Sequence, residues 1–208
     1  MKREFTGVDR LIELVAVLVL GIATVGTAWC GYQAAQWNGV QASAMTASTD
    51  ARVEASRLFG LATQKASYDS SMIAQYAQAV QAGNTKLVSF YRTTLIREEM
   101  LPVIDRWAAE IKAGGSPTRL IDDTSYLDTQ FGPYRAATLK ADSLSKVAIA
   151  AGETSHDYII NTILLAVALF FSGVMTSFTY RPARVLLVLA AIGTVAVAAV
   201  NLVDLPIA

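Results

Sequence analysis

The chain has 208 residues, of which 53% are hydrophobic and only 16% are charged. The charged fraction lies well below the roughly 25% of soluble domains, because the sequence contains three long apolar blocks. Its 17 Lys and Arg residues balance its 17 Asp and Glu residues, so net charge attracts no nucleic acid. We therefore expect an integral membrane protein whose first partner is the lipid bilayer.

A short tail, residues 1–10, precedes the first apolar block. We predict that this tail is cytoplasmic and that residues 11–35 form transmembrane helix 1. A run of about 20 apolar residues crosses a hydrocarbon core of roughly 30 Å as a helix. A cleaved signal peptide is the alternative, since Lys2 and Arg3 begin the chain and Gly26-Thr27-Ala28 is a small-residue triplet. The apolar run is longer than such peptides usually carry.

Residues 36–156 are predicted to form an extracytoplasmic helical bundle. No proline occurs from Gln36 to Val80, which indicates a long helix continuous with transmembrane helix 1. Its buried face is predicted from apolar residues spaced by three or four: Leu58, Leu61 or Ala62, Tyr68, Met72, Tyr76 and Val80. Gly83 is expected to make a turn, with Asn84 or Thr85 capping the next helix.

The second bundle helix is predicted for about Thr85 to Lys112, with Pro102 either kinking it or starting a new segment. Residues 113–134 are expected to form a loop, and a third helix runs from about Tyr134 into the next membrane segment. The bundle helices are rich in Ala, which buries little area per residue. We therefore expect the bundle to gain stability from neighbouring copies or another subunit.

Two further spans complete the predicted topology. Transmembrane helix 2 covers residues 157–178, a cytoplasmic loop 179–183, transmembrane helix 3 covers 184–204, and 205–208 form the C-terminal end. Lys2, Arg3 and Arg10 lie in the tail, and Arg181 and Arg184 lie between the last two spans. Because short cytoplasmic segments are enriched in Lys and Arg, both regions are predicted to be cytoplasmic. The overall fold class is an all-α membrane protein with its extramembrane domain between the first two spans.

Transmembrane helix 1 carries a stripe of small and polar residues that falls within about 80° of a helical wheel. We call this set the small-residue stripe: Glu13, Val17, Gly21, Thr24, Ala28, Gly31 and Ala35. One interpretation is a helix-packing seam, because small residues let backbones approach closely in lipid. The other is a pore lining, with Glu13 forming a charged ring in an oligomer.

Aromatic residues flank the membrane segments at the predicted outer surface. Trp29, Tyr32, Trp37 and Tyr158 are predicted to form an interfacial aromatic belt.

A few polar residues lie in or beside the last two spans. Asn161, Ser172 and Asn201 are expected to make interhelical hydrogen bonds. His156-Asp157 is either a solvated interfacial pair or a pH sensor.

Few residues are available for catalysis or for binding a metal ion. Cys30 and His156 are the only residues of their types, so a metal site would consist mostly of carboxylates. No P-loop, GxGxxG, HExxH, GxSxG or CxxC motif occurs. The pairs Glu98-Glu99 and Asp122-Asp123 are interpreted as solvated surface. We therefore expect no enzyme, no catalytic residues, no cofactor and no metal ligands.

Two stretches carry a resemblance. One is TAWCGYQAAQWNGVQA after the first span, with the pattern WxxYQxxxWxGxQ, and the other is HDYIINTILLAVALFFSGV, with the pattern YxxxTxLxAxxLFFxG. Both resemble a family of uncharacterised three-span proteins of the bacterial inner membrane. The resemblance implies this topology and a bacterial inner membrane, but it implies no activity.

These observations favour a non-enzymatic structural or accessory subunit of a homo-oligomer or a larger membrane complex. An oligomeric ion channel lined by transmembrane helix 1 is the first alternative. An extracytoplasmic sensor is the second, although the short cytoplasmic segments offer no output domain.

Overall fold

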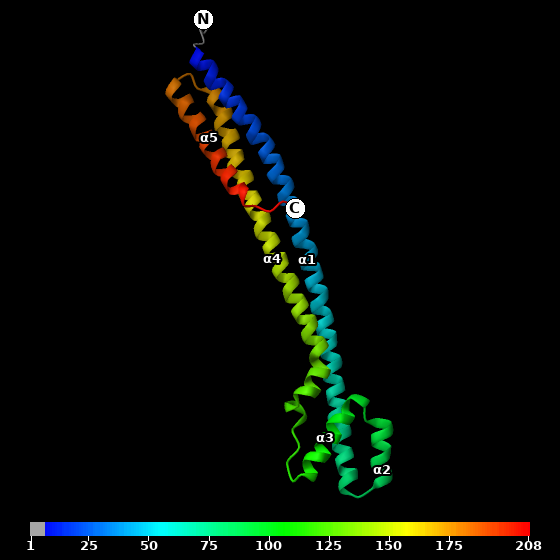
Figure 1. Cartoon of the computed structure of the whole chain (residues 1–208). Coiled ribbons are helices and arrows are strands. Elements are labelled where there is room, and N and C mark those ends of the chain that lie inside the picture. Colours follow the sequence, from blue (N-terminus) through cyan, green and yellow to red (C-terminus); the bar gives the residue numbers. More distant parts are fainter. Residues whose placement is uncertain (1–6) are drawn as a thin grey trace. The chain divides into compact units, whose positions relative to one another are not determined.

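The computed structural model describes residues 7–208, apart from the side chains of Val8 and Asp9. Residues 1–6 of the predicted tail therefore lie outside the described residues. Figure 1 shows the helices in chain order. They are α1 (Gly7–Gln81), α2 (Thr85–Phe90), α3 (Leu101–Lys112), α4 (Thr124–Val174) and α5 (Arg181–Val203). Short helical turns lie between them: η1 (Tyr91–Leu95), η2 (Glu98–Met100), η3 (Leu120–Asp122) and η4 (Met175–Ser177).

The all-α class is confirmed, since residues 7–208 contain helices and no strand. Three of the helices are long and apolar enough, by length and composition, to cross a membrane. They occupy Arg10–Gln81, Thr124–Ser177 and Arg181–Val203. The structure is thus compatible with a multi-pass membrane protein.

The chain divides into two compact units. The apolar unit comprises Met1–Met45 and Ser145–Ala208, and the polar unit comprises Thr46–Leu144. Because α1 and α4 each run through both ranges, each contributes one part of its length to each unit. The continuity of α1 confirms the prediction that the first apolar block runs into a long helix without a break.

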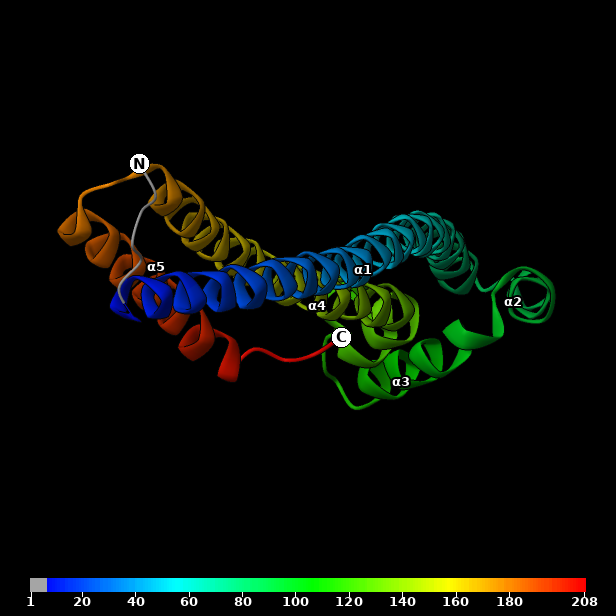
Figure 2. The ribbon, with the colours of Figure 1, turned by 90° about the horizontal axis from the view of Figure 1, so that it is seen from above.

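In the apolar unit, α1, α4 and α5 lie side by side (Figures 1 and 2). The core contains the following residues: Ala23, Cys30 and Ala34 from α1, Tyr158, Leu165 and Ala168 from α4, and Ala198 from α5. Small side chains let these helices approach closely. A Cβ atom added to Gly26, for example, would lie 3.0 Å from Cδ1 of Leu165.

In the polar unit, α1 and α4 pack antiparallel along an alanine-rich seam that includes Ala55 and Ala62. Ser48 Oγ donates a hydrogen bond to the Ala141 carbonyl oxygen at 2.8 Å. Further along, the rings of Phe59 and Tyr134 lie 5.2 Å apart. A second cluster contains Ile96, Met100, Val103, Ile104 and Tyr126.

The turn after α1 is confirmed. Gly83 has a φ of 67°, a conformation that glycine adopts at little cost. The Asn84 side chain then caps α2 by accepting a hydrogen bond from the Leu87 backbone N–H at 3.1 Å.

The prediction of a single helix from Thr85 to Lys112 is wrong, because the helical segment is interrupted between η1 and η2. Ile96 and Arg97 adopt extended backbone angles there, with ψ of 128° and 146°. The break places Ile96 in the core and lets the Arg97 side chain reach α1. Of the two alternatives predicted for Pro102, a kink or a new segment, the structure shows a new segment, since Pro102 occupies the first turn of α3.

The predicted loop 113–134 is too long, because α4 already begins at Thr124. Asp123 caps this helix, since its Oδ1 accepts a hydrogen bond from the Tyr126 N–H at 3.0 Å. Pro133 lies inside α4, although the helix was predicted to begin only at about Tyr134.

Candidate functional site

The small-residue stripe lies on the exposed side of α1. Every one of its seven residues, from Glu13 to Ala35, is solvent-exposed in this chain. The packed face of α1 carries different residues, among them Ala16, Ala23 and Cys30. At 100° per residue the two faces point roughly 130° apart. Helices α4 and α5 therefore leave the predicted stripe uncovered.

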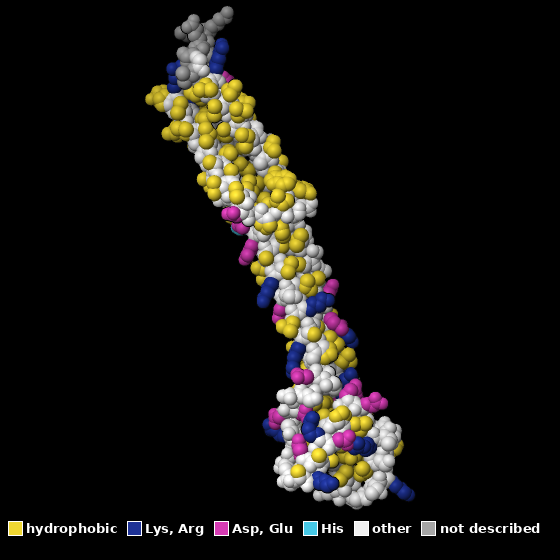
Figure 3. Space-filling model, viewed as in Figure 1, with side chains coloured by type: hydrophobic (Ala, Val, Ile, Leu, Met, Phe, Trp, Pro, Cys, Tyr) yellow, Lys and Arg dark blue, Asp and Glu magenta, His cyan; other side chains and the backbone are white. Residues whose placement is uncertain are grey.

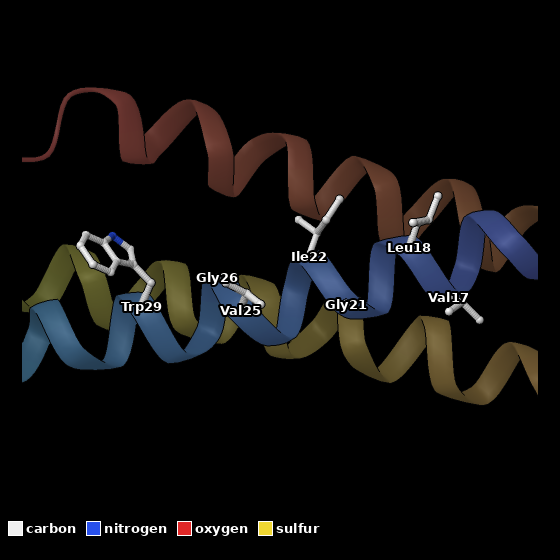
Figure 4. Close-up of a pocket in the computed structure, with 7 residues that line it drawn as sticks. All are labelled: Val17, Leu18, Gly21, Ile22, Val25, Gly26 and Trp29. Carbon is white, nitrogen blue, oxygen red and sulfur yellow. The ribbon is translucent and has the colours of Figure 1, made fainter.

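An apolar groove of 640 Å³ runs beside this stripe. Figure 4 shows that its walls come from successive turns of α1. They are Val17, Leu18, Gly21, Ile22, Val25, Gly26 and Trp29. A Cβ atom added to Gly21, which also lines the groove, would meet nothing within 4 Å, so this position is open. The groove is thus an apolar surface feature without a polar group that could do chemistry.

The four residues of the predicted aromatic belt differ in their surroundings. Trp29 and Tyr32 are exposed and lie with ring centroids 6.2 Å apart. Tyr158 is buried between helices, and Trp37 is half-buried. Trp37 Nε1 and the Tyr158 hydroxyl both donate hydrogen bonds to the Pro206 carbonyl oxygen, at 3.0 and 3.2 Å. Two of these aromatic side chains thus hold the segment that follows α5.

The polar residues of the second span do not all form the expected interhelical hydrogen bonds. Asn161 Nδ2 donates to the Asp157 carbonyl oxygen, one turn earlier in α4 itself, at 3.0 Å. Asn161 Oδ1 and Ser172 Oγ are buried without a hydrogen-bond partner. In the apolar unit, Ser155 Oγ of α4 donates a hydrogen bond to the Ala34 carbonyl oxygen of α1 at 2.9 Å.

The polar unit contains a buried charge cluster that the sequence did not predict. Asp69 of α1 is only 1% exposed and accepts hydrogen bonds from Arg97 Nε at 2.9 Å and Nη2 at 2.6 Å. The Tyr126 hydroxyl donates to the same carboxylate at 2.8 Å. Arg97 Nη2 also donates to Gln130 Oε1 at 3.0 Å. We call Asp69, Arg97, Tyr126 and Gln130 the Asp69 cluster.

Electrostatics within the Asp69 cluster follow from burial and from this bonding. Burial, and then the hydrogen bond to Asp69, raises the pKa of the Tyr126 hydroxyl well above its ordinary value. The hydrogen bond to Asp69 raises the pKa of the Arg97 guanidinium. The raised pKa values keep the Tyr126 phenol protonated and Arg97 charged, and the hydrogen bonds to Asp69 hold both side chains in place.

The interpretation of Asp122-Asp123 as solvated surface is wrong for one member of the pair. Asp123 is only 5% exposed, and besides capping α4 its carboxylate pairs with Arg106. Asp122 stays exposed and pairs with Arg119 at 2.7 Å. The first backbone N–H groups of α4 lack partners within the helix, and the Asp123 carboxylate accepts a hydrogen bond from one of them.

Among the described residues, no three His, Cys, Asp or Glu side chains gather as metal ligands. The chain matches no protein-family model, no curated protein and no solved structure. The resemblance carried by its two junction patterns therefore stays a prediction.

Proposed function

We propose that this protein is a non-enzymatic integral membrane protein that serves as a structural or accessory subunit of a homo-oligomer or a larger membrane complex. The proposed location is the bacterial inner membrane, with the N-terminus cytoplasmic and the polar unit periplasmic or extracellular. Three apolar helices and the position of Lys and Arg in the short connecting segments support this topology. A reporter enzyme that works only outside the cytoplasm should be active when it is fused after Ala208. An inactive fusion would contradict the proposed orientation.

The observation that carries the proposal is the uncovered small-residue stripe of α1. Helices associate in lipid through van der Waals packing rather than through exclusion of water, so small residues mark faces where backbones approach. Residues such as Ala23 and Ala198 already serve this purpose within the chain. Gly21, Ala28 and Gly31 have the same character but face outward. A second copy or another membrane helix would pack against that outer face.

Figure 3 shows how hydrophobic side chains cover the visible face of the apolar unit. Large exposed side chains on α5, such as Leu186 and Leu189, are typical of lipid contact. The stripe differs from these surfaces because it offers little side-chain bulk to the lipid. This contrast supports a protein partner at the stripe and lipid contact on α5.

The test uses Ala28→Leu in the stripe and Ala196→Leu on α5 as the matched control. Both positions are exposed, and both variants add the same bulk. Native mass spectrometry after gentle detergent extraction should show that Ala28→Leu loses its copies or partners, whereas Ala196→Leu keeps them. The proposal fails if the wild-type protein is a monomer without partners, or if both variants assemble equally.

An oligomeric pore lined by α1 is the second candidate. The observation that favours it is the place of Glu13, which is exposed at one end of the same stripe. In a closed ring of copies these carboxylates would meet at one level of the membrane. Glu13→Gln should then change cation flux through liposomes that contain the protein. Unchanged flux would leave the stripe as a packing surface only.

A further inference from the structure

The residues that follow α5 form a short non-helical segment that turns back onto the other two helices of the apolar unit. We call residues 204–208 the strap. Pro206 explains why the helix ends before it, because a proline disfavours helical angles at the preceding residue, Leu205. Figure 1 shows the strap, in red, crossing from the end of α5 to α1. The end of α5 is therefore tethered to a helix far from it in the sequence.

Three hydrogen bonds hold the backbone of the strap. Trp37 Nε1 of α1 and the Tyr158 hydroxyl of α4 both donate to the Pro206 carbonyl oxygen, at 3.0 and 3.2 Å. The Ala208 backbone N–H donates to Gln33 Oε1 of α1 at 3.0 Å. Side chains from two helices thus bind a carbonyl group and an N–H group that lie two residues apart on the strap.

The strap and the side chains that hold it differ in burial. Gln33 and Tyr158 are each only 1% exposed, so they belong to the packing between helices. Leu205 is half-buried and packs against the core cluster that contains Cys30 and Tyr158. Residues 206–208 are exposed. The strap is therefore held by its backbone and by one apolar side chain, and it lies over a core that is already complete on its other sides.

Helices α1 and α4 have a direct connection at the same level of the unit. Ser155 Oγ donates to the Ala34 carbonyl oxygen at 2.9 Å, one residue after Gln33 in α1. This bond does not involve the strap. Breaking the few contacts of the strap therefore leaves α1 and α4 joined, and segments with so few contacts open locally without unfolding the rest of a protein.

From these features we propose that the strap is a releasable clasp at the end of α5. When it is closed, it fixes the end of α5 to α1 and α4 and covers the core at Cys30. When it is released, the end of α5 is free to separate while α1 and α4 stay paired. The clasp is thus a conformational device of the apolar unit, and it does not depend on the proposed function, since it acts within one chain.

The rate at which N-ethylmaleimide labels Cys30 tests the clasp, with the full chain in an uncharged detergent and intact-mass spectrometry as the readout. Cys30 is the only cysteine and is 0% exposed, so its reaction requires local opening. The double variant Gln33→Met, Tyr158→Phe keeps the bulk of both side chains and removes two hydrogen bonds to the strap. Cys30 should react about 5–150-fold faster in this variant, the effect of losing two hydrogen bonds of ordinary strength.

The matched control is the double variant Tyr32→Phe, Gln36→Met. It makes the same two kinds of change in an exposed pair, in which Gln36 Nε2 donates to the Tyr32 hydroxyl at 2.7 Å. This variant should label Cys30 at the wild-type rate. Equal acceleration in the control, or an unchanged rate in Gln33→Met, Tyr158→Phe, overturns the proposal.

A second probe separates release of the strap from loosening of the whole unit. Ala16 is buried in the cluster with Met175 and Val188, which lies apart from the cluster that contains Cys30. In the Cys30→Ala, Ala16→Cys background, the strap substitutions Gln33→Met and Tyr158→Phe should leave the labelling rate unchanged. An acceleration equal to that at Cys30 would show general loosening and would overturn the clasp.

Discussion

In the polar unit, α1 and α4 enclose an ion pair, whereas in the apolar unit the same two helices enclose alanine, cysteine and amide side chains. The two units differ because only the polar unit offers each buried charged group a partner of opposite charge. Asp69 and Arg97 each satisfy the other, and Tyr126 and Gln130 use the remaining hydrogen-bonding positions. The apolar unit contains no such pair among its described residues, and its contacts depend on close backbone approach.

This contrast teaches that one helix can use two kinds of packing along its length. Alanine is common on both buried parts of α1, at Ala23 and Ala34 in one unit and at Ala55 and Ala62 in the other. Only the polar unit adds a specific charge cluster. We therefore expect single substitutions to have their largest effects in the polar unit.

The largest effect is expected from Asp69→Ala. Removing one partner of a buried pair leaves Arg97 uncompensated, which should cost about 3–5 kcal/mol. Hydrogen–deuterium exchange of the full chain in detergent should show lost protection across residues 85–130. Asp128→Ala is the control, since its pair with Arg135 is exposed and is worth less than about 1 kcal/mol. A similar loss of protection in both variants would show that the Asp69 cluster stabilises the polar unit no more than an exposed ion pair does.

Tyr126→Phe should have an intermediate effect, about 1.5–3 kcal/mol, because it removes one hydrogen bond to a charged group. The raised pKa of Tyr126 also predicts a pH dependence. Its stabilisation is fully present below about pH 10, the pKa of an unfolded tyrosine, and falls as the pH rises above it. Denaturant titrations followed by circular dichroism from about pH 9 to 11 measure this loss.

Because other groups titrate in the same range, the comparison is between variants. Tyr126→Phe should lose less stability than the wild-type protein over that pH interval. Parallel curves for the two proteins would show that Tyr126 contributes nothing to the pH dependence.

The smallest of these effects is expected in the apolar unit. Ala23 is completely buried, so Ala23→Leu overpacks the seam and should cost about 1–3 kcal/mol. Thermal unfolding in detergent should show a lower midpoint for Ala23→Leu than for Ala28→Leu, whose side chain is exposed. A larger loss than that of Asp69→Ala would reverse the comparison between the two units.

Local signals in the sequence predicted several features correctly. The Gly83 turn was predicted outright, whereas the Asn84 cap and the new segment at Pro102 were each one of two predicted alternatives. All three depend on backbone chemistry that acts within a few residues. The three apolar helices are local in the same sense, because their length and composition suffice to identify them.

The buried face of α1 in the polar unit was predicted only in part. Periodicity favoured Tyr68 and Val80, yet both are exposed, and their neighbours Asp69 and Ala79 are buried. A shift of one residue changes a helix face by about 100°. Hydrophobicity could not find Asp69, because its burial depends on Arg97 and Tyr126 arriving from distant parts of the chain.

The sequence by itself thus determined the helical class, the three apolar helices and the turn signals, since each depends on neighbouring residues. Only the tertiary structure decided which face of α1 is covered. It also decided that Asp69 has a charged partner and that Gln33, Trp37 and Tyr158 together hold the strap. The physical reason is that burial and pairing depend on which helices meet, and contacts between residues far apart in the chain leave little trace in local periodicity.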